Sequence, residues 1–283
     1  MQKTFIKRPT EELLEDIRFL DLYQNGVYVE KATPVQRLQQ LAHALHPVKT
    51  HFPLIRVGSP HDGGYLVPDD LKGISACFSP GVDVNSSFEV DLLLKTGIGS
   101  HLADYSVDGP PANFKPKSFI KKFLGPNNNA IHTTLDNWVK SQSEYQLDQD
   151  FLLQMDIEGG EYLTLLATPQ EVIKRFRIIV LEIHAVECWA HPLFFSTVEA
   201  MFEKILTDFY PVHNHPNNHG AQLNLNGFAT PQFFEITFLR KDRSAVTGYC
   251  GEFPHELDSA CYKSRNELPL CGNWYSQTSS PGT

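Results

Sequence analysis

Several features are missing from this sequence, and each absence excludes a class of protein. No run of apolar residues approaches the roughly 20 that a helix needs to cross a bilayer. The first fifteen residues lack the apolar segment of a signal peptide, so we expect a cytoplasmic protein without a membrane partner. The basic excess that non-specific nucleic-acid binding requires is also missing, because the formal net charge is −9.

Two common binding motifs are absent as well. The cysteines are five in number and include no C-x-x-C pair. In a reducing cytosol we interpret them as free thiols, and their spacing does not indicate a zinc site built from them. There is no G-x-G-x-x-G, so the fingerprint of a dinucleotide-binding domain is absent too.

What the sequence does contain, from about residue 74, is an alternation of short apolar segments with helical ones. This alternation predicts a parallel sheet covered by helices on both faces. The expected strands are Ser75–Ser79, His101–Tyr105, Ala130–Thr133, Phe151–Asp156 and Arg177–His184. The expected helices are Ser86–Lys95, Leu135–Lys140, Tyr162–Phe176 and Thr197–Leu206.

Two later strands complete this α/β prediction. Phe209–His213 and Phe233–Arg240 are joined by a long loop rich in Asn, His and Gly, with no helix between them. A link without a helix is typical of an antiparallel pair. We therefore expect a seven-stranded, mostly parallel sheet with an antiparallel closing strand.

The two ends of the chain differ from this central region, which we assign to residues 51–250. Residues 1–50 are expected to form an N-terminal helical extension, with helices that begin at Thr10 and at Thr33-Pro34. Residues 251–283 have little periodicity and are expected to form a C-terminal tail that packs as loop.

In open α/β sheets, ligands bind at the carboxyl ends of the strands, so the residues that follow each strand are the candidates for a site. Gly81 follows the first strand, where it permits either a tight turn or the close approach of a ligand. Asp104 follows the second strand and is placed to accept hydrogen bonds from both hydroxyls of a ribose. Alternatively, Asp104 is a turn residue that faces solvent, and Asp108 takes the ribose-binding role in its place.

The fourth strand delivers three carboxylates within six residues, namely Asp156, Glu158 and Glu161. Such groups repel one another and need a cation, a proton or a hydrogen-bond donor. The first turn of the next helix would explain Glu158 and Glu161, because the helix dipole favours negative charge there. It does not explain Asp156, which ends a buried strand.

Histidines and further carboxylates follow the later strands. Glu182 and His184 end the fifth strand, and the segment from His213 to His219 contains three histidines and three asparagines. We expect His184, His213 or His215 to act with Asp156 as a general base, since histidine titrates near neutrality. Alternatively, Asp156, Glu182 and His213 bind a divalent metal ion.

The segment from Leu152 to Tyr162 resembles the defining motif of the FkbM-type methyltransferases, in which an apolar strand runs into Asp-(Ile/Val)-Glu-Gly-x-Glu. Thr134-Leu135-Asp136 looks like the Thr-Leu-Asp element of that family. Three other segments are similar to a branch of methyltransferase-like proteins related to it: Arg56 to Gly58, Asp62 to Tyr65, and His213 to Asn218. The resemblance covers roughly residues 54 to 240.

This resemblance implies a class I methyltransferase (Rossmann-like) fold, S-adenosylmethionine as the cofactor, and transfer to a hydroxyl of a sugar or other small molecule. Carried over by position, the cofactor-binding residues are Gly81, Asp83, Glu89, Asp104 and Asp136. The residues implied for binding the acceptor are Asp62, Tyr65, Glu158, Asn217 and Asn218. The sequence departs from the pattern at the glycine-rich first motif, which is reduced to Pro80-Gly81-Val82-Asp83.

Two other functions fit the same residues. A metal-dependent glycosyltransferase also uses carboxylates at a strand end, to bind a nucleotide sugar. A protein that keeps the fold as a non-catalytic binding module is the second alternative.

Overall fold

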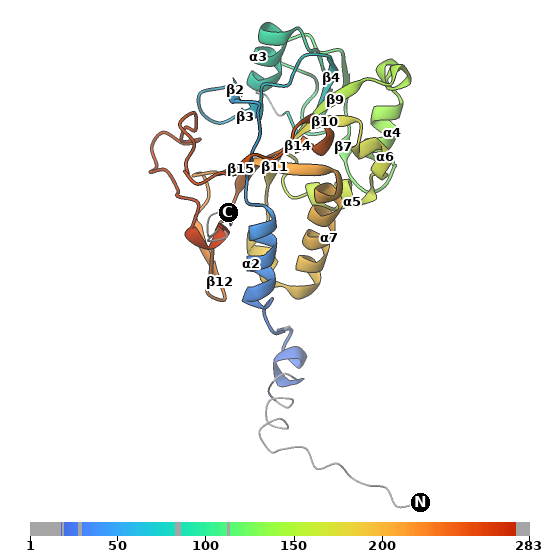
Figure 1. Ribbon diagram of the computed structural model, residues 1–283. Helices are drawn as coiled ribbons and strands as arrows, with labels where there is room; N and C mark the ends of the chain where they lie inside the picture. The colour runs from blue at the N-terminus through green and yellow to red at the C-terminus, as the bar shows by residue number, and fades with distance from the viewer. Residues whose placement is uncertain (1–17, 19, 28–29, 83–85, 112–113, 276–283) are drawn as a thin grey trace, which may run out of the picture.

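A seven-stranded sheet forms the centre of the computed structural model, which describes residues 18, 20–27, 30–82, 86–111 and 114–275 (Figure 1). The strand order is β11-β14-β10-β9-β4-β5-β6. The strands are β4 (Ile74–Pro80), β5 (Ser100–Ala103), β6 (Ser118–Ile120), β9 (Asp150–Met155), β10 (Phe176–Ile183), β11 (Phe209–Pro216) and β14 (Phe234–Arg240). Neighbours pair in parallel except β14, which is antiparallel to both β10 and β11. The predicted α/β sheet, mostly parallel with an antiparallel closing strand, is therefore confirmed.

The order of the strands reverses at β4. The chain passes from β4 to β5 and β6 on one side, and then returns to β9 and β10 on the other side. All eight residues of β10 are buried, as expected for an inner strand that is covered on both faces. The gap between the carboxyl ends of β4 and β9 is thus a topological switch point.

The helices divide between the two faces of the sheet. On one face, alternate strand residues such as Leu153 pack against α2 (Val35–Ala44), α4 (Leu135–Lys140), α5 (Glu161–Ala167), α6 (Gln170–Ile173) and α7 (Pro192–Asp208). On the other face, Leu152 and its counterparts pack against α3 (Ser87–Thr96) and the hairpin of β2 (Leu54–Gly58) and β3 (Gly64–Pro68). The sheet is therefore covered on both faces, as the sequence predicts.

Segments near both ends of the described chain join the larger core. Leu38 and Leu41 of α2 belong to it, and so does Trp274 in the 3-10 helix η4 (Gly272–Trp274). Figure 1 shows α2 beside α7, where Arg37 forms an ion pair with Glu199, and η4 on the other side of α2. Over residues 251–275, the described part of the tail, η4 is the element of regular structure.

One sheet strand was predicted at the wrong place. The third parallel strand is β6, whereas the expected segment Ala130–Thr133 contributes only β8 (His132–Thr133), which pairs with β7 (Phe123–Leu124) in a separate ribbon. β6 has only three residues, all half-buried, at the edge of the sheet, so the sequence contains no apolar run there. Its pairing with β5 is what makes this segment a strand.

The helix expected over Tyr162–Phe176 is divided into α5 and α6. Pro169 is the N-cap of α6, and a proline inside a continuous helix would lack the N–H that the helix requires. Pro34 rather than Thr33 is the N-cap of α2, and α7 begins at Pro192 rather than Thr197. The helix expected from Thr10 lies mostly outside the described residues. No helix within the described ranges is long and apolar enough to cross a bilayer.

Short elements complete the chain. β12 (Gln222–Leu225) and β13 (Phe228–Pro231) form a hairpin inside the loop between β11 and β14, and β1 (Val48–Lys49) pairs with β15 (Gly248–Tyr249). The remaining 3-10 helices are η1 (Ser143–Leu147), η2 (Val186–Ala190) and η3 (Lys241–Arg243).

Candidate active site

A cavity of about 410 Å³ opens at the carboxyl ends of β4, β5 and β9, at the switch point of the sheet. Open α/β sheets bind their ligands at this position. Small-molecule sites have volumes of roughly 300–1,000 Å³, so the cavity has a suitable size. Its wall contains seven of the residues singled out in the sequence: Asp62, Tyr65, Gly81, Glu89, Asp104, Asp156 and Glu158.

Gly81 joins β4 to the cavity and lies directly against β9. Its φ of +81° is in the left-handed region that favours glycine, and its N–H donates to the Ala103 carbonyl at 3.0 Å. A Cβ at this position would lie 1.6 Å from the Asp156 carbonyl oxygen. Gly81 is therefore required both for the turn and for close contact between the ends of β4 and β9.

Glu89 forms a buried polar floor together with two residues that the sequence reasoning missed. It lies on α3, and the Ser79 hydroxyl bonds with its carboxyl group. The same hydroxyl lies 2.5 Å from the side-chain oxygen of Gln154. Burial raises the pKa of Glu89, and the bond with Ser79 only partly opposes this rise. Ser79 and Gln154 were missed because each lies inside a strand that is otherwise apolar.

Asp104 is a buried residue of the cavity wall and not a turn residue that faces solvent. Its Oδ1 accepts hydrogen bonds from the Ser106 N–H and the Ser106 hydroxyl, both at 2.7 Å. Asp108 is fully exposed and pairs with Lys121 instead. Of the two alternatives for an acidic residue after β5, only Asp104 is at the cavity.

The turn after β9 has an unusual backbone. Glu158 and Gly159 have φ values of +57° and +97°, and a non-glycine residue in the left-handed region carries strain. Ala185, which follows His184 at the end of the adjacent strand, also has a positive φ of +55°. Such strain is maintained only when the surrounding structure fixes it, and it is concentrated at functional sites.

His184 lies at the centre of a cluster of carboxylates. Its Nε2 is 3.7 Å from Asp156 and 3.6 Å from Glu158, and its Nδ1 is 3.4 Å from Glu161. Glu161 is completely buried, and its Oε2 has no hydrogen-bond partner among the residues that the structure describes. Glu161 also accepts the Ile157 N–H at 2.9 Å, so it is more than a favourable charge at the start of α5.

Two groups of this cluster have shifted pKa values. The pKa of Asp156 is raised to about 7: burial is the largest cause, Glu161 and Glu158 add to the rise, and His184 opposes it. Burial lowers the pKa of His184, but Glu161 and the other carboxylates outweigh this effect and raise it. A carboxyl group that titrates near neutrality is suited to proton transfer. The ligand atoms of Asp156, Glu161 and His184 also lie within 4.8 Å of one another, a spacing that could hold a metal ion.

Glu182 extends the cluster along the sheet. It accepts hydrogen bonds from Asn217 at 2.8 Å and from the Tyr65 hydroxyl at 3.4 Å. It faces Glu235 in the pairing of β10 with β14, and Glu235 in turn faces His215 in the pairing of β14 with β11. Burial raises the pKa of Glu182 well above its ordinary value, and Asp156 and Glu235 add to the rise. A row of ionisable side chains thus runs from the cavity to the edge of the sheet.

The histidines of β11 are not in the cavity wall, contrary to the catalytic role expected for them. His213 Nε2 lies 2.9 Å from Asp258, and His215 Nε2 lies 2.5 Å from Glu267. Both carboxylates belong to the tail, which covers this edge of the sheet. The pairing of β11 places the two histidines on the far side of β14 from β10, and this explains why they do not reach Asp156.

The asparagines that follow these histidines have structural partners too. Asn217 reaches Glu182, as described above, and its side-chain oxygen accepts the His219 N–H at 2.8 Å. The Asn218 amide donates to the Tyr262 carbonyl at 2.9 Å and accepts the Tyr262 N–H at 2.7 Å. Neither side chain is in the cavity wall, so the acceptor-binding role expected for them is not supported by their positions.

Three other expectations have different outcomes. Asp136 lies in the first turn of α4, pairs with Lys140 at 3.7 Å, and is not in the cavity wall. The expected metal set of Asp156, Glu182 and His213 is not brought together, because His213 is engaged by the tail. Asp83 lies outside the described residues. No protein-family model, curated protein or solved structure matches the chain.

Proposed function

We propose that the chain is an S-adenosylmethionine-dependent methyltransferase that methylates a hydroxyl of a sugar or other small molecule. The observation that carries this proposal is the cavity at the switch point, which joins Gly81, Glu89 and Asp104 on one side to Asp156 on the other. The seven-stranded sheet with one antiparallel strand supports it as well, because it agrees with the fold that the FkbM-type resemblance implies.

The residues of the cavity fit this cofactor. Asp104 offers a carboxylate for the ribose hydroxyls, and Glu89 adds a second buried carboxyl group to the same wall. Phe123 and Leu124 supply apolar surface for a purine ring in the same wall. S-adenosylmethionine supplies an electrophilic methyl group on a sulfonium sulfur.

Asp156 is the proposed general base. It accepts the proton of the acceptor hydroxyl while the new carbon–oxygen bond forms and the carbon–sulfur bond breaks, which leaves S-adenosylhomocysteine. A carboxyl group with a pKa of about 7 is ionised in enough molecules at neutral pH to do this. A positioned base contributes typically 10²–10⁴-fold to a rate, and alignment of the two reactants contributes more.

A divalent ion would use the same residues. Asp156, Glu161 and His184 offer two oxygens and one nitrogen, and the unsatisfied Oε2 of Glu161 is available as a ligand. An ion there would lower the pKa of the acceptor hydroxyl. To test this variant of the mechanism, a chelator is used to remove metal and one ion is then added back. Turnover that is lost with the chelator and recovered with the added ion would indicate that the metal takes part.

The test is calorimetry with S-adenosylmethionine, S-adenosylhomocysteine and a nucleotide sugar such as UDP-glucose. We expect the first two ligands to bind and the third not to bind. Asp104→Ala should weaken cofactor binding at least tenfold, whereas Asp108→Ala, a matched change on the exposed side of the same loop, should not alter it. Binding of UDP-glucose alone would support the glycosyltransferase, and binding of none of the three would support the non-catalytic module.

A further inference from the structure

A second cluster of potential metal ligands lies at the other end of the row, away from the cavity. It consists of His215 on β11, Glu235 on β14 and Cys261 in the tail. The three residues are 1%, 4% and 6% exposed, and their ligand atoms all lie within 4.8 Å of one another. Three separate segments therefore bring a nitrogen, an oxygen and a sulfur atom to one buried point.

The spacing of these atoms is that of ligands around a single ion. Cys261 Sγ is 3.2 Å from one carboxylate oxygen of Glu235, and His215 Nδ1 is 3.7 Å from the other. Ligands of a tetrahedral zinc ion, with bonds of 2.0–2.3 Å, lie roughly 3.3–3.7 Å apart. The three ligand atoms therefore lie close enough together to share one ion.

The orientation of His215 provides an independent observation. Its Nε2 lies 2.5 Å from Glu267, so the ring is oriented with Nδ1 toward Glu235 and the cluster. Histidines that bind metals almost always donate their other ring N–H to a carboxylate or carbonyl, which fixes the ring. Glu267 occupies that supporting position.

The surroundings of the cluster are rich in negative charge. Glu182 faces Glu235 on the neighbouring strand, and both carboxylates are buried. Their basic partners are histidines: His184 Nε2 lies 3.8 Å from Glu182, and His215 Nδ1 lies 3.7 Å from Glu235. A buried carboxylate needs a compensating cation or proton, and a dication would serve both.

We propose that His215, Glu235 and Cys261 bind a zinc ion that fastens the tail to the edge of the sheet. A set of one nitrogen, one oxygen and one thiolate sulfur suits zinc, which accepts all three donors and imposes a tetrahedral arrangement. Three protein ligands leave the fourth position of the tetrahedron for a water molecule. Zinc binding displaces the thiol proton of Cys261, and no oxidant or reductant is involved.

The first test measures metal in the purified full chain after dialysis against metal-free buffer. Elemental analysis should find one zinc per chain, and replacement by Co²⁺ should produce the charge-transfer absorption of a thiolate-bound ion. Cys261→Ser should remove this absorption, whereas Cys188→Ser, a matched change at a free cysteine outside the cluster, should retain it. Absence of the absorption from the wild-type chain would overturn the proposal without any variant having to fold.

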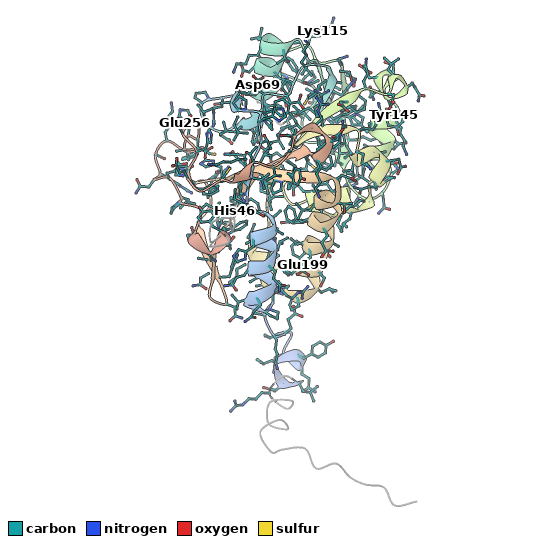
Figure 2. All side chains as sticks on the ribbon, in the orientation of Figure 1. His46, Asp69, Lys115, Tyr145, Glu199 and Glu256 are labelled. Carbon is teal, nitrogen blue, oxygen red and sulfur yellow. The ribbon has the colours of Figure 1, made fainter. Side chains whose placement is uncertain are left out.

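The second test uses the supporting carboxylate, because Glu267→Gln keeps an oxygen that can accept from His215. Loss of such a supporting group typically costs 10–100-fold in metal affinity, so a competition titration with a chromophoric chelator should show a weakening in that range. Glu256→Gln is the control, since Glu256 is exposed on the outer loop of the tail (Figure 2). Equal zinc affinity in the two variants would show that Glu267 does not support a metal ligand and would contradict the proposed site.

Discussion

The two ends of the row of ionisable side chains have opposite environments. At one end Asp156 borders an open cavity, and at the other end His213 and His215 are covered by the tail and paired with its carboxylates. Asp156 follows β9 and the two histidines lie near the end of β11, so both ends of the row belong to the same sheet and carry ionisable side chains. The type of a residue at the end of a strand therefore does not determine its chemical role. A substrate can reach the residue only where no other segment, such as the tail, covers that part of the sheet.

The largest expected effect is at the open end. Asp156→Asn should lower turnover by about 10²–10⁴-fold, because the variant keeps the shape of the side chain but cannot accept the acceptor proton. Affinity for S-adenosylmethionine should change less than threefold, as measured by calorimetry. The matched change Asp136→Asn, outside the cavity, should leave both quantities unaltered. Full turnover in Asp156→Asn would show that Asp156 is not the general base. The two ends would then not differ in catalytic role.

A second test concerns the backbone of the open end. Gly81→Ala should destabilise the protein by about 3–5 kcal/mol, because it adds strain at a positive φ to a backbone clash with Asp156. Gly97→Ala is the control, since Gly97 has a similar φ of +78° but open space around it, and should cost only about 1–2 kcal/mol. Chemical denaturation measures the free energy of unfolding of both variants. Equal losses of stability would show that the close contact between β4 and β9 does not add to the cost of the substitution at Gly81.

At the closed end we expect a loss of stability without a loss of catalysis. Asp258→Asn should cost about 1.5–3 kcal/mol, because it replaces a charged hydrogen bond to His213 by a neutral one. The hydrogen bond with His213 lowers the pKa of Asp258 against the opposing effect of burial, so this stabilisation is present at neutral pH and is lost as acid protonates the carboxylate. Thermal unfolding at pH 7 checks the effect, with Glu256→Gln as the control. A tenfold loss of cofactor affinity in Asp258→Asn would instead connect the tail to the cavity.

The smallest expected effect is a gain of stability at the open end. Because the pKa of Asp156 is raised from 3.8 to about 7 in the folded chain, its stabilising contribution is complete below about pH 4 and is lost as the pH rises to about 7. Asp156→Asn has no such loss. Its melting temperature relative to wild type should therefore increase by about 2–4 °C between pH 6 and pH 7, which corresponds to about 1 kcal/mol. A constant difference across this range would mean that the carboxyl group is not held in a destabilising environment.

The elements with a strong apolar pattern were predictable, and those defined by pairing were not. The inner strands β9 and β10 are continuous apolar segments, and their ends were located to within a residue or two. The edge strand β6 consists of three half-buried residues between lysines, so only its pairing with β5 defines it. The hairpin of β2 and β3, which supplies Tyr65 to the cavity wall, was also missed.

The site was predictable as far as it is local in the sequence. Asp156, Glu158 and Glu161 lie within one turn after β9, and Gly81 and Asp104 each follow a strand of the same sheet. The role of the β11 histidines was not predictable, because their partners Asp258 and Glu267 lie in a segment without periodicity. Nothing in the local sequence indicates which of the tail carboxylates folds back onto the sheet.

The distance along the chain between His215 and Glu267 has a consequence for synthesis. These two residues are separated by 52 positions, and a ribosome adds roughly 5–20 residues per second. For about 3–10 seconds, β11 has therefore been synthesised but Glu267, whose carboxylate orients His215, has not. During this interval the nascent chain presents an uncovered strand edge, to which a chaperone or a second nascent chain can bind.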